Sequence, residues 1–179
     1  GTADTTFIST LTSVAQNSGD VAILPGGKVV VAGNAMGSIA GVATSVALLK
    51  PDGSRDNDFI FRSGIAGRIR KVIQQADGKV VVAGEFPFIN GTARNSMARL
   101  NADGSLDAGF VPFFNNFPAR QVIFALAVLP DGKILAGASG GILLSRINPD
   151  GTQDSTFNTT LQSSSLIYDM FVQPDGKIL

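Results

Sequence analysis

The chain has 179 residues, of which 44% are hydrophobic, so it is long enough and apolar enough to bury a sizeable core. It carries 14 basic and 14 acidic residues, and this formal charge of zero gives no support to a nucleic-acid or anionic-membrane partner. It has no cysteine, which excludes disulfides and cysteine-based metal sites, and no apolar run approaches the ~18 residues of a membrane span.

Two short strings alternate along the chain and define a tandem repeat. The first string ends in lysine and occurs as LPGGK at 24–28, QADGK at 75–79, LPDGK at 129–133 and QPDGK at 173–177. The second has the form G-x-x-D-x-x-F and begins at Gly1, Gly53, Gly104 and Gly151. The four lysines are 51, 54 and 44 residues apart, so one repeat is about 50 residues long.

Each string is predicted to be a tight turn between two antiparallel strands. Proline sets φ at the first turn position, aspartate suits the second, and glycine accepts the left-handed conformation that closes the turn. The flanking runs are short, apolar and β-branched, as in 29–32 and 80–83, and their lack of alternation indicates strands buried on both faces. One repeat therefore reads as strand A, turn, strand B, longer loop, strand C, turn and strand D.

Four antiparallel strands in a unit of about 50 residues are typical of a β-propeller blade. A β-sandwich is the alternative, but it gives no reason for two in-register turn strings in every unit. We predict an all-β fold, a partial β-propeller of about three and a half four-stranded antiparallel blades over residues 1–179. In chain order, the expected segments are the end of a blade at 1–7, full blades at 20–59, 70–110 and 122–157, and the start of a further blade at 166–179.

A pair of small residues closes strand B in each full unit. These pairs are Ala32-Gly33, Ala83-Gly84 and Ala136-Gly137. Small side chains at one recurring place predict that a neighbouring unit approaches closely there. Because about four to eight blades are needed to close a ring, we also expect the missing blades to come from the rest of a longer protein or from another chain.

The repeats resemble the delta-60 repeats of large bacterial surface and secreted proteins. The resemblance rests on QADGKVVVAGEFPFINGTARNSMARLNADGSLDAGF at 75–110, INPDGTQDSTF at 147–157 and QPDGKIL at 173–179. It covers essentially the whole chain, although the loop at 34–44 departs from the pattern and the loop at 139–141 is shortened. It implies a β-propeller, an extracellular or cell-surface location, and no established catalysis.

Strand alternation divides the loops between two ends of each blade. The A–B and C–D turns lie at one end, the turn face, while the B–C loops and the D–A linkers lie at the other, the loop face. Binding residues usually lie on variable loops of a rigid scaffold, so the loop face is the first place to look. Candidate residues for an interaction surface there are Phe86, Phe88, Arg94, Phe117, Arg120, Arg68 and Arg70.

Two interpretations of these residues stay open. As a surface, the aromatic and basic groups predict a patch that holds a protein or glycan partner. Alternatively, the phenylalanine rings pack between blades and the arginines form a solvated rim.

Catalysis and metal binding find little support. The chain has no histidine, so the commonest general base is missing. Aspartates cluster near the turns, as in Asp52, Asp56 and Asp58, but their spacing does not match an EF-hand loop and turns already account for them. We expect no catalytic residue, no metal and no cofactor.

The predicted function is therefore a non-catalytic β-propeller segment of a large secreted or cell-surface bacterial protein. It would mediate adhesion, protein–protein or glycan interaction, or assembly, with no nucleic-acid binding and no membrane insertion. The alternative is a propeller enzyme or lectin whose functional residues lie outside these 179 residues.

Overall fold

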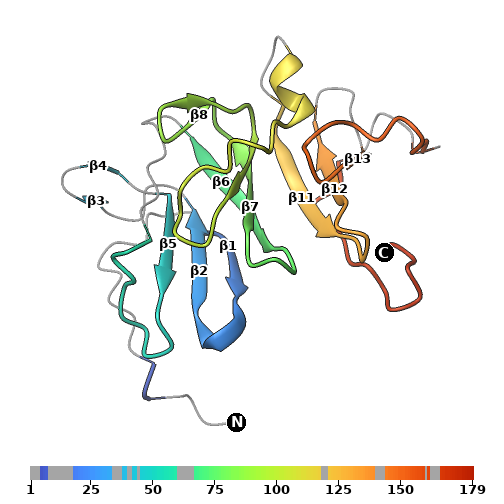
Figure 1. Ribbon diagram of the computed structural model, residues 1–179. Helices are drawn as coiled ribbons and strands as arrows, with labels where there is room; N and C mark the ends of the chain where they lie inside the picture. The colour runs from blue at the N-terminus through green and yellow to red at the C-terminus, as the bar shows by residue number, and fades with distance from the viewer. Residues whose placement is uncertain are drawn as a thin grey trace.

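In a computed structural model, the described residues form three three-stranded antiparallel sheets, one from each full repeat, and two small two-stranded hairpins. The structure describes residues 5–7, 18–33, 38–39, 42–43, 45–59, 67–117, 121–139, 144–159, 161 and 166–179. Figure 1 shows the sheets spread like a fan, with the first (blue to cyan) and the third (orange) on opposite sides of the second (green). This arrangement confirms the predicted all-β, propeller-like fold.

The three sheets share one strand order, A-B-C, in which strand B is central. The first sheet consists of β1 (Ser18–Ile23), β2 (Val29–Gly33) and β5 (Val46–Leu49). The second consists of β6 (Arg68–Gln74), β7 (Val80–Glu85) and β10 (Met97–Leu100). The third consists of β11 (Ile123–Val128), β12 (Ile134–Ala138) and β13 (Leu144–Ile147).

Short elements occupy the connections between these strands. The turn from β1 to β2 contains a 3-10 segment at Pro25–Gly27, and the linker before the third sheet contains another at Phe113–Asn116. Two small hairpins lie in B–C loops, namely β3 (Ser38–Ile39) with β4 (Val42–Ala43), and β8 (Phe88–Ile89) with β9 (Thr92–Ala93).

Strand D is shorter than predicted. In each of the three full repeats it is a single β-bridge to strand C. Arg55 bridges Leu49, Leu106 bridges Leu100, and Gln153 bridges Ile147. The next residue is the motif aspartate, whose side chain accepts a hydrogen bond from the amide two residues later, as Asp107 does from Gly109 N. An aspartate that bonds its own backbone in this way starts a turn, which ends the strand after one pair.

The core lies between neighbouring sheets and explains the apolar run of strand β7. Val80 and Val82 belong to the cluster shared with the first sheet, which also contains Val30. Val81 and Ala83 belong to the cluster shared with the third sheet. Both faces of β7 are therefore covered, as the lack of alternation predicted.

Strand A is the innermost strand of each sheet. Strand β6 contacts both β1 and β11, which are the A strands of the two adjacent sheets. In Figure 1, β1 and β11 lie toward the middle of the fan, while β5 and β13 lie on its outer sides. A propeller axis consequently runs along the A strands.

The small residues at the end of strand B make close contacts of two kinds. A Cβ atom on Gly137 would lie 2.9 Å from the Cβ of Ile167, which belongs to the following repeat. A Cβ atom on Gly84 would lie 2.8 Å from the backbone nitrogen of Arg70, which belongs to strand A of the same sheet. The expected approach of a neighbouring unit is therefore found at Gly137, whereas Gly84 is tight against its own sheet.

Candidate functional site

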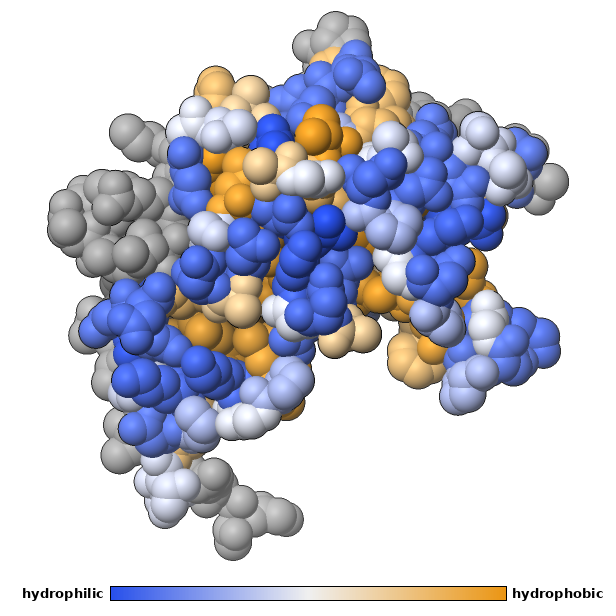
Figure 2. All heavy atoms as spheres, in the orientation of Figure 1, coloured by the Kyte–Doolittle hydropathy of each residue, from blue (hydrophilic) through white to orange (hydrophobic). Residues whose placement is uncertain are grey.

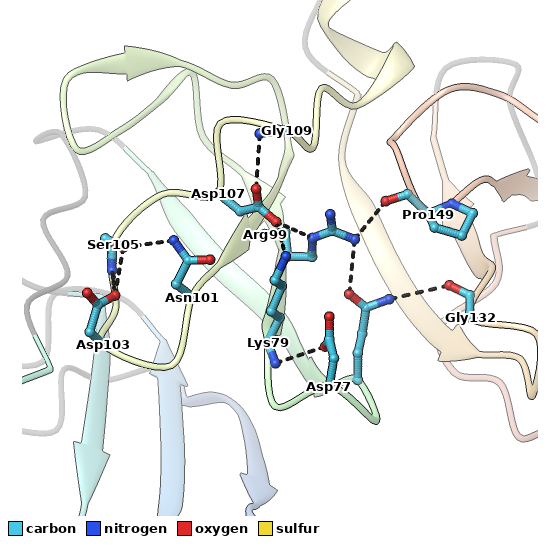
Figure 3. A network of polar contacts seen from close by, with 11 residues as sticks. Asp77, Lys79, Arg99, Asn101, Asp103, Ser105, Asp107, Gly109, Gly132 and Pro149 are labelled. Atoms are coloured by element: carbon cyan, nitrogen blue, oxygen red, sulfur yellow. Dashed lines mark hydrogen bonds and ion pairs between the residues drawn. The ribbon is translucent and has the colours of Figure 1, made fainter.

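The repeated aspartates of the turn face are engaged in ion pairs. Asp107 accepts hydrogen bonds from Arg99 Nε at 2.8 Å and from Lys79 Nζ at 2.9 Å (Figure 3). In the other two full repeats Lys28 pairs with Asp56 at 2.9 Å, and Lys133 pairs with Asp154 at 2.8 Å. The lysine of the first string thus binds the aspartate of the second, which joins the two turns of each blade.

These contacts shift the acidity of the aspartates. Burial by itself would raise the pKa of Asp107, but hydrogen bonds from Lys79 and Arg99 outweigh it, so the pKa is lowered. The pKa of Asp56 is lowered mainly by the hydrogen bond from Lys28. The ammonium of Lys133, with a smaller effect of Thr156, holds the pKa of Asp154 well below its usual range.

Arg99 also joins the second and third repeats. Arg99 Nη1 donates to the backbone oxygen of Pro149 at 2.7 Å, and it also contacts Gln75 Oε1 at 3.4 Å. Gln75 in turn donates to the backbone oxygen of Gly132 at 3.3 Å (Figure 3). The turn face is therefore a structural network, and within the described residues no group of three acidic, histidine or cysteine side chains is placed to hold a metal ion.

The structure removes two of the predicted surface residues from the surface. Phe86 is 0% exposed and belongs to the hydrophobic cluster between the first two sheets. Arg94 is 8% exposed and donates from Nη1 to the backbone oxygen of Ala93 at 2.9 Å, so it is held within its own loop.

The other predicted residues fall into four situations. Phe88 is 49% exposed, in hairpin β8–β9. Phe117 is half-buried, and its ring centroid lies 5.7 Å from that of Phe113 in a small aromatic cluster. Arg120 lies outside the described residues. Arg68 and Arg70 remain, and the structure brings these two together.

Arg68 and Arg70 line a cavity of about 150 Å³ with Gly19, Phe124 and Tyr168. These residues come from β1, β6, β11 and the segment that follows the third sheet, so four consecutive repeats contribute. Arg68 is the first residue of β6 and Phe124 is the second of β11, which places the cavity at the loop-face end of the A strands. We call it the axial site.

A β-bulge places one residue of each A strand at this site. In β6, Ile69 pairs with Gly84 and Lys71 with Ala83, so Arg70 is skipped by the register. The register of β11 skips Phe124 in the same way, and that of β1 skips Gly19. Bulges commonly redirect a side chain beside functional sites, and here the bulged residue is an axial residue in all three sheets.

The positive charges of the two arginines in the axial site are only weakly compensated by the described residues. The Nε atoms of Arg68 and Arg70 are both buried, and neither has a hydrogen-bond partner among the described residues. Burial lowers the pKa of Arg70, the charge of Arg68 lowers it further, and Glu85 raises it. Arg70 Nη2 is 3.9 Å from Glu85 Oε2, at the outer limit of an ion pair. The site is thus suited to an added anion.

Aromatic rings form the other wall of the axial site. The guanidinium carbon of Arg70 lies 4.9 Å from the centre of the Phe124 ring. The Phe124 and Tyr168 rings meet edge to face, with their centres 5.5 Å apart. Tyr168 is 65% exposed, so its ring stands at the mouth of the cavity.

Sequence reasoning missed Gly19, Phe124 and Tyr168, although the repeat itself contains a signal that could have found them. Gly19, Arg70, Phe124 and Tyr168 each stand five residues before the first residue of a turn string. Counting back from the turns would have shown them to be equivalent positions.

A second hollow, of about 280 Å³, lies between the first two sheets at the turn face. It is lined mainly by apolar groups such as Leu24, Phe59 and Val80. Lys28 is the charged residue among its lining, and it is already paired with Asp56. This hollow therefore offers less to a polar ligand than the axial site.

The fold is similar to that of one solved structure in particular. Virginiamycin B lyase from Staphylococcus aureus superposes with a TM-score of 0.60 at 15% sequence identity, over 94% of this chain and 50% of the lyase chain. This chain thus spans about half the length of that propeller. The extracellular domain of BT4673 from B. thetaiotaomicron, described as a one-component system, is more distant, with a TM-score of 0.44 at 15% identity over 96% of this chain and 27% of that one. No curated protein matches the chain by sequence.

A family model matches more than half of the chain. It is described as a β-propeller domain of unknown function, DUF5122, and it matches residues 24–59, 75–110 and 129–157. Each matched segment runs from the first turn string to the phenylalanine of the second, so it covers strands B and C with their turns. In the described part of the chain, the helical segments are all too short to cross a membrane. From its repeats and its fold, the chain belongs to the DUF5122 β-propeller family.

Proposed function

We propose that this chain is a non-catalytic β-propeller segment of a secreted or cell-surface bacterial protein, and that it binds a protein or glycan partner through its loop face. The observation that carries the proposal is the axial site, where two arginines line a cavity beside an exposed aromatic ring and their Nε atoms have no partner among the residues that the structure describes. Ligand sites are typically concave, largely aromatic or apolar, and equipped with a few convergent polar groups.

The contrast between the two faces supports this assignment. On the turn face, charged groups such as Asp107 and Arg99 are bound to one another. On the loop face, Arg68 Nε lacks a partner among the described residues, and Phe88 is half exposed. Adhesion, partner binding or assembly would use the face whose groups are not already committed. The resemblance to delta-60 repeats supports the secreted or surface location.

Further blades are part of the proposal, supplied by the rest of a longer protein or by another chain. Val21 of β1 is 58% exposed, whereas the equivalent residues Val72 and Leu126 are 4% and 6% exposed because a preceding sheet covers them. Figure 2 shows hydrophobic residues (orange) left visible between the polar segments on the face that it presents. A further sheet of the same kind would cover such side chains.

The proposal is tested by a glycan-array and pull-down screen on the wild-type chain and on Arg68→Gln, Arg70→Gln and Phe88→Ala. Partner binding that is lost in these variants while their circular dichroism is unchanged would support it. Lys50→Gln is the matched control, since Lys50 is an exposed cation beside a turn on the opposite face. Turnover of any substrate, or binding that survives all three substitutions, would contradict the proposal.

A further inference from the structure

The axial site contains two neighbouring arginines whose positive charges are not balanced by a close carboxylate of the described residues. Arg68 and Arg70 stand on one strand, on either side of Ile69, and the charge of Arg68 disfavours the charged form of Arg70. Each guanidinium has a buried Nε atom that finds no acceptor among the described residues. A buried donor without a partner is unfavourable, and an oxyanion that reaches the Nε edge of an arginine removes that penalty.

Nearby carboxylates do not meet this need. Asp169 is bound to Lys71 Nζ at 2.9 Å, and Asp20 Oδ2 accepts the amide of Val72 at 3.1 Å. Glu85 Oε2 lies 3.9 Å from Arg70 Nη2, so this carboxylate approaches a terminal nitrogen of the guanidinium and leaves Nε without an acceptor among the described residues. Among the described residues, Asp169 and Asp20 are therefore bound elsewhere, and Glu85 approaches Arg70 at a terminal nitrogen.

The aromatic wall indicates what else the ligand carries. Phe124 is already covered by the guanidinium of Arg70, but Tyr168 is 65% exposed and faces the mouth. An exposed ring beside a charged group suits a ligand with one flat apolar face and one anionic edge. Inorganic phosphate and sulfate have no such face. A sugar acid has both, because its ring C–H groups form an apolar face and its carboxylate lies at the edge.

The size of the cavity limits how much of a ligand enters. A volume of about 150 Å³ is smaller than the roughly 300–1,000 Å³ of pockets that enclose drug-sized molecules. It holds a single terminal unit, and the remainder of a saccharide would extend over the loop face.

We infer that the axial site, lined by Arg68, Arg70, Phe124 and Tyr168, binds the terminal residue of an acidic saccharide, with its carboxylate on the guanidinium groups and its ring against Tyr168. This inference rests on the proposed function and names the ligand class. It adds a ligand contact at Tyr168, which lies in the fourth repeat.

The chain contains its own probe for this test. Tyr168 is its only tyrosine and it has no tryptophan, so intrinsic fluorescence reports on the axial site alone. Digalacturonic acid is titrated into the wild-type chain, with neutral digalactose as the shape-matched control and sulfate as the charge-only control. We expect saturable change of the Tyr168 signal with digalacturonic acid and much weaker response to both controls.

Variants then assign the contacts. Arg68→Gln and Arg70→Gln should each weaken digalacturonic acid binding by ~10-fold or more, the loss expected for a hydrogen bond to a charged group. Arg70→Lys should also weaken it, because lysine keeps the charge but not the forked geometry. Lys50→Gln should leave binding unchanged. Circular dichroism verifies folding, and if Arg70→Gln does not fold, Arg68→Gln and the wild-type titrations still decide the question.

Several outcomes would overturn the inference. Equal binding of digalacturonic acid and digalactose would show that the carboxylate is not recognised, and sulfate binding as tight as digalacturonic acid would show that the sugar is not. Binding of an acidic peptide in place of the saccharide would overturn the ligand class while leaving the proposed partner-binding function in place. Loss of both this binding and all binding in the wider screen would count against the two together.

Discussion

Arg99 Nε donates to Asp107 Oδ2 at 2.8 Å, and this pair explains the repeated motif G-x-x-D-x-x-F. The guanidinium carbon of Arg99 lies 4.6 Å from the ring centre of Phe110, the phenylalanine of the same motif. Arg146 repeats the arrangement with Asp154, and its guanidinium carbon lies 4.8 Å from the ring centre of Phe157. The aspartate and the phenylalanine of the motif therefore bracket one arginine from strand C.

The first repeat lacks this arginine, which gives a built-in comparison. Leu48 occupies its position, since Asp56 N bonds Leu48 O as Asp107 N bonds Arg99 O. Asp107→Asn should lower the free energy of unfolding by about 2 kcal/mol, because the largely buried Arg99 loses its charged partner. Asp56→Asn should have a smaller effect, because only Lys28 is released. Urea denaturation of the two variants measures both, and equal losses would contradict the role assigned to Arg99.

Stability should fall in acid. Lysine and arginine partners lower the pKa of Asp56, Asp107 and Asp154 in the folded state, so the folded protein prefers the ionised carboxylates. Their contribution is complete above the usual aspartate pKa of about 3.9 and is lost as the pH falls below it through the folded-state values. The urea midpoint should therefore change little between about pH 7 and 5 and drop below about pH 4. Asp107→Asn should show a shallower drop, and a wild-type midpoint that is constant to pH 2 would refute the prediction.

The bulge that aims Arg70 depends on Gly84. A Cβ atom at this position would lie 2.8 Å from the backbone nitrogen of Arg70, and backbone cannot move aside as a flexible side chain can. Gly84→Ala should lower stability by about 1–3 kcal/mol and disturb the axial site. Gly109→Ala is the control, since its nearest neighbour is the side-chain Oδ1 of Asp107 at 3.3 Å. Thermal unfolding of the two variants should differ clearly, and similar melting temperatures would argue against tight packing at Gly84.

The uncovered face of β1 should cause self-association. Val21 and Ile23 are 58% and 80% exposed, and apolar side chains on one strand face favour contact with a second copy. Light scattering should detect concentration-dependent association of the chain, and the double substitution Val21→Thr with Ile23→Thr should reduce it. Threonine keeps the β-branched shape, so the urea midpoint should be nearly unchanged. A wild-type chain that stays monomeric at high concentration would contradict the prediction that another sheet belongs on this face.

The blade architecture was accessible from the sequence because its determinants are local. Turn residues at fixed offsets, such as Pro130-Asp131-Gly132, need only their own backbone to form a turn, and the observed positive φ of 81° at Gly132 agrees. Strand D is shorter than the sequence predicts, because the side chain of the motif aspartate accepts a hydrogen bond from the amide two residues later and so starts a turn. Among the candidate surface residues, Phe86 follows the alternative interpretation, in which the phenylalanine rings pack between blades, and Arg94 is buried as well.

The sequence by itself determined the repeat, its turns and the two buried faces of β7, since each follows from residue order within about 50 positions. In β2, where the same was expected, Val29 and Val31 are only half-buried. Only the tertiary structure decided that Arg70, Phe124 and Tyr168 meet, because they lie on different repeats that approach one another around an axis. It also decided that the turn-face Asp107 is bound, while Arg68 Nε and Arg70 Nε have no partner in the described part of the chain. The reason is that the pairing of a charged group depends on distance in space, which residue order along one repeat does not specify.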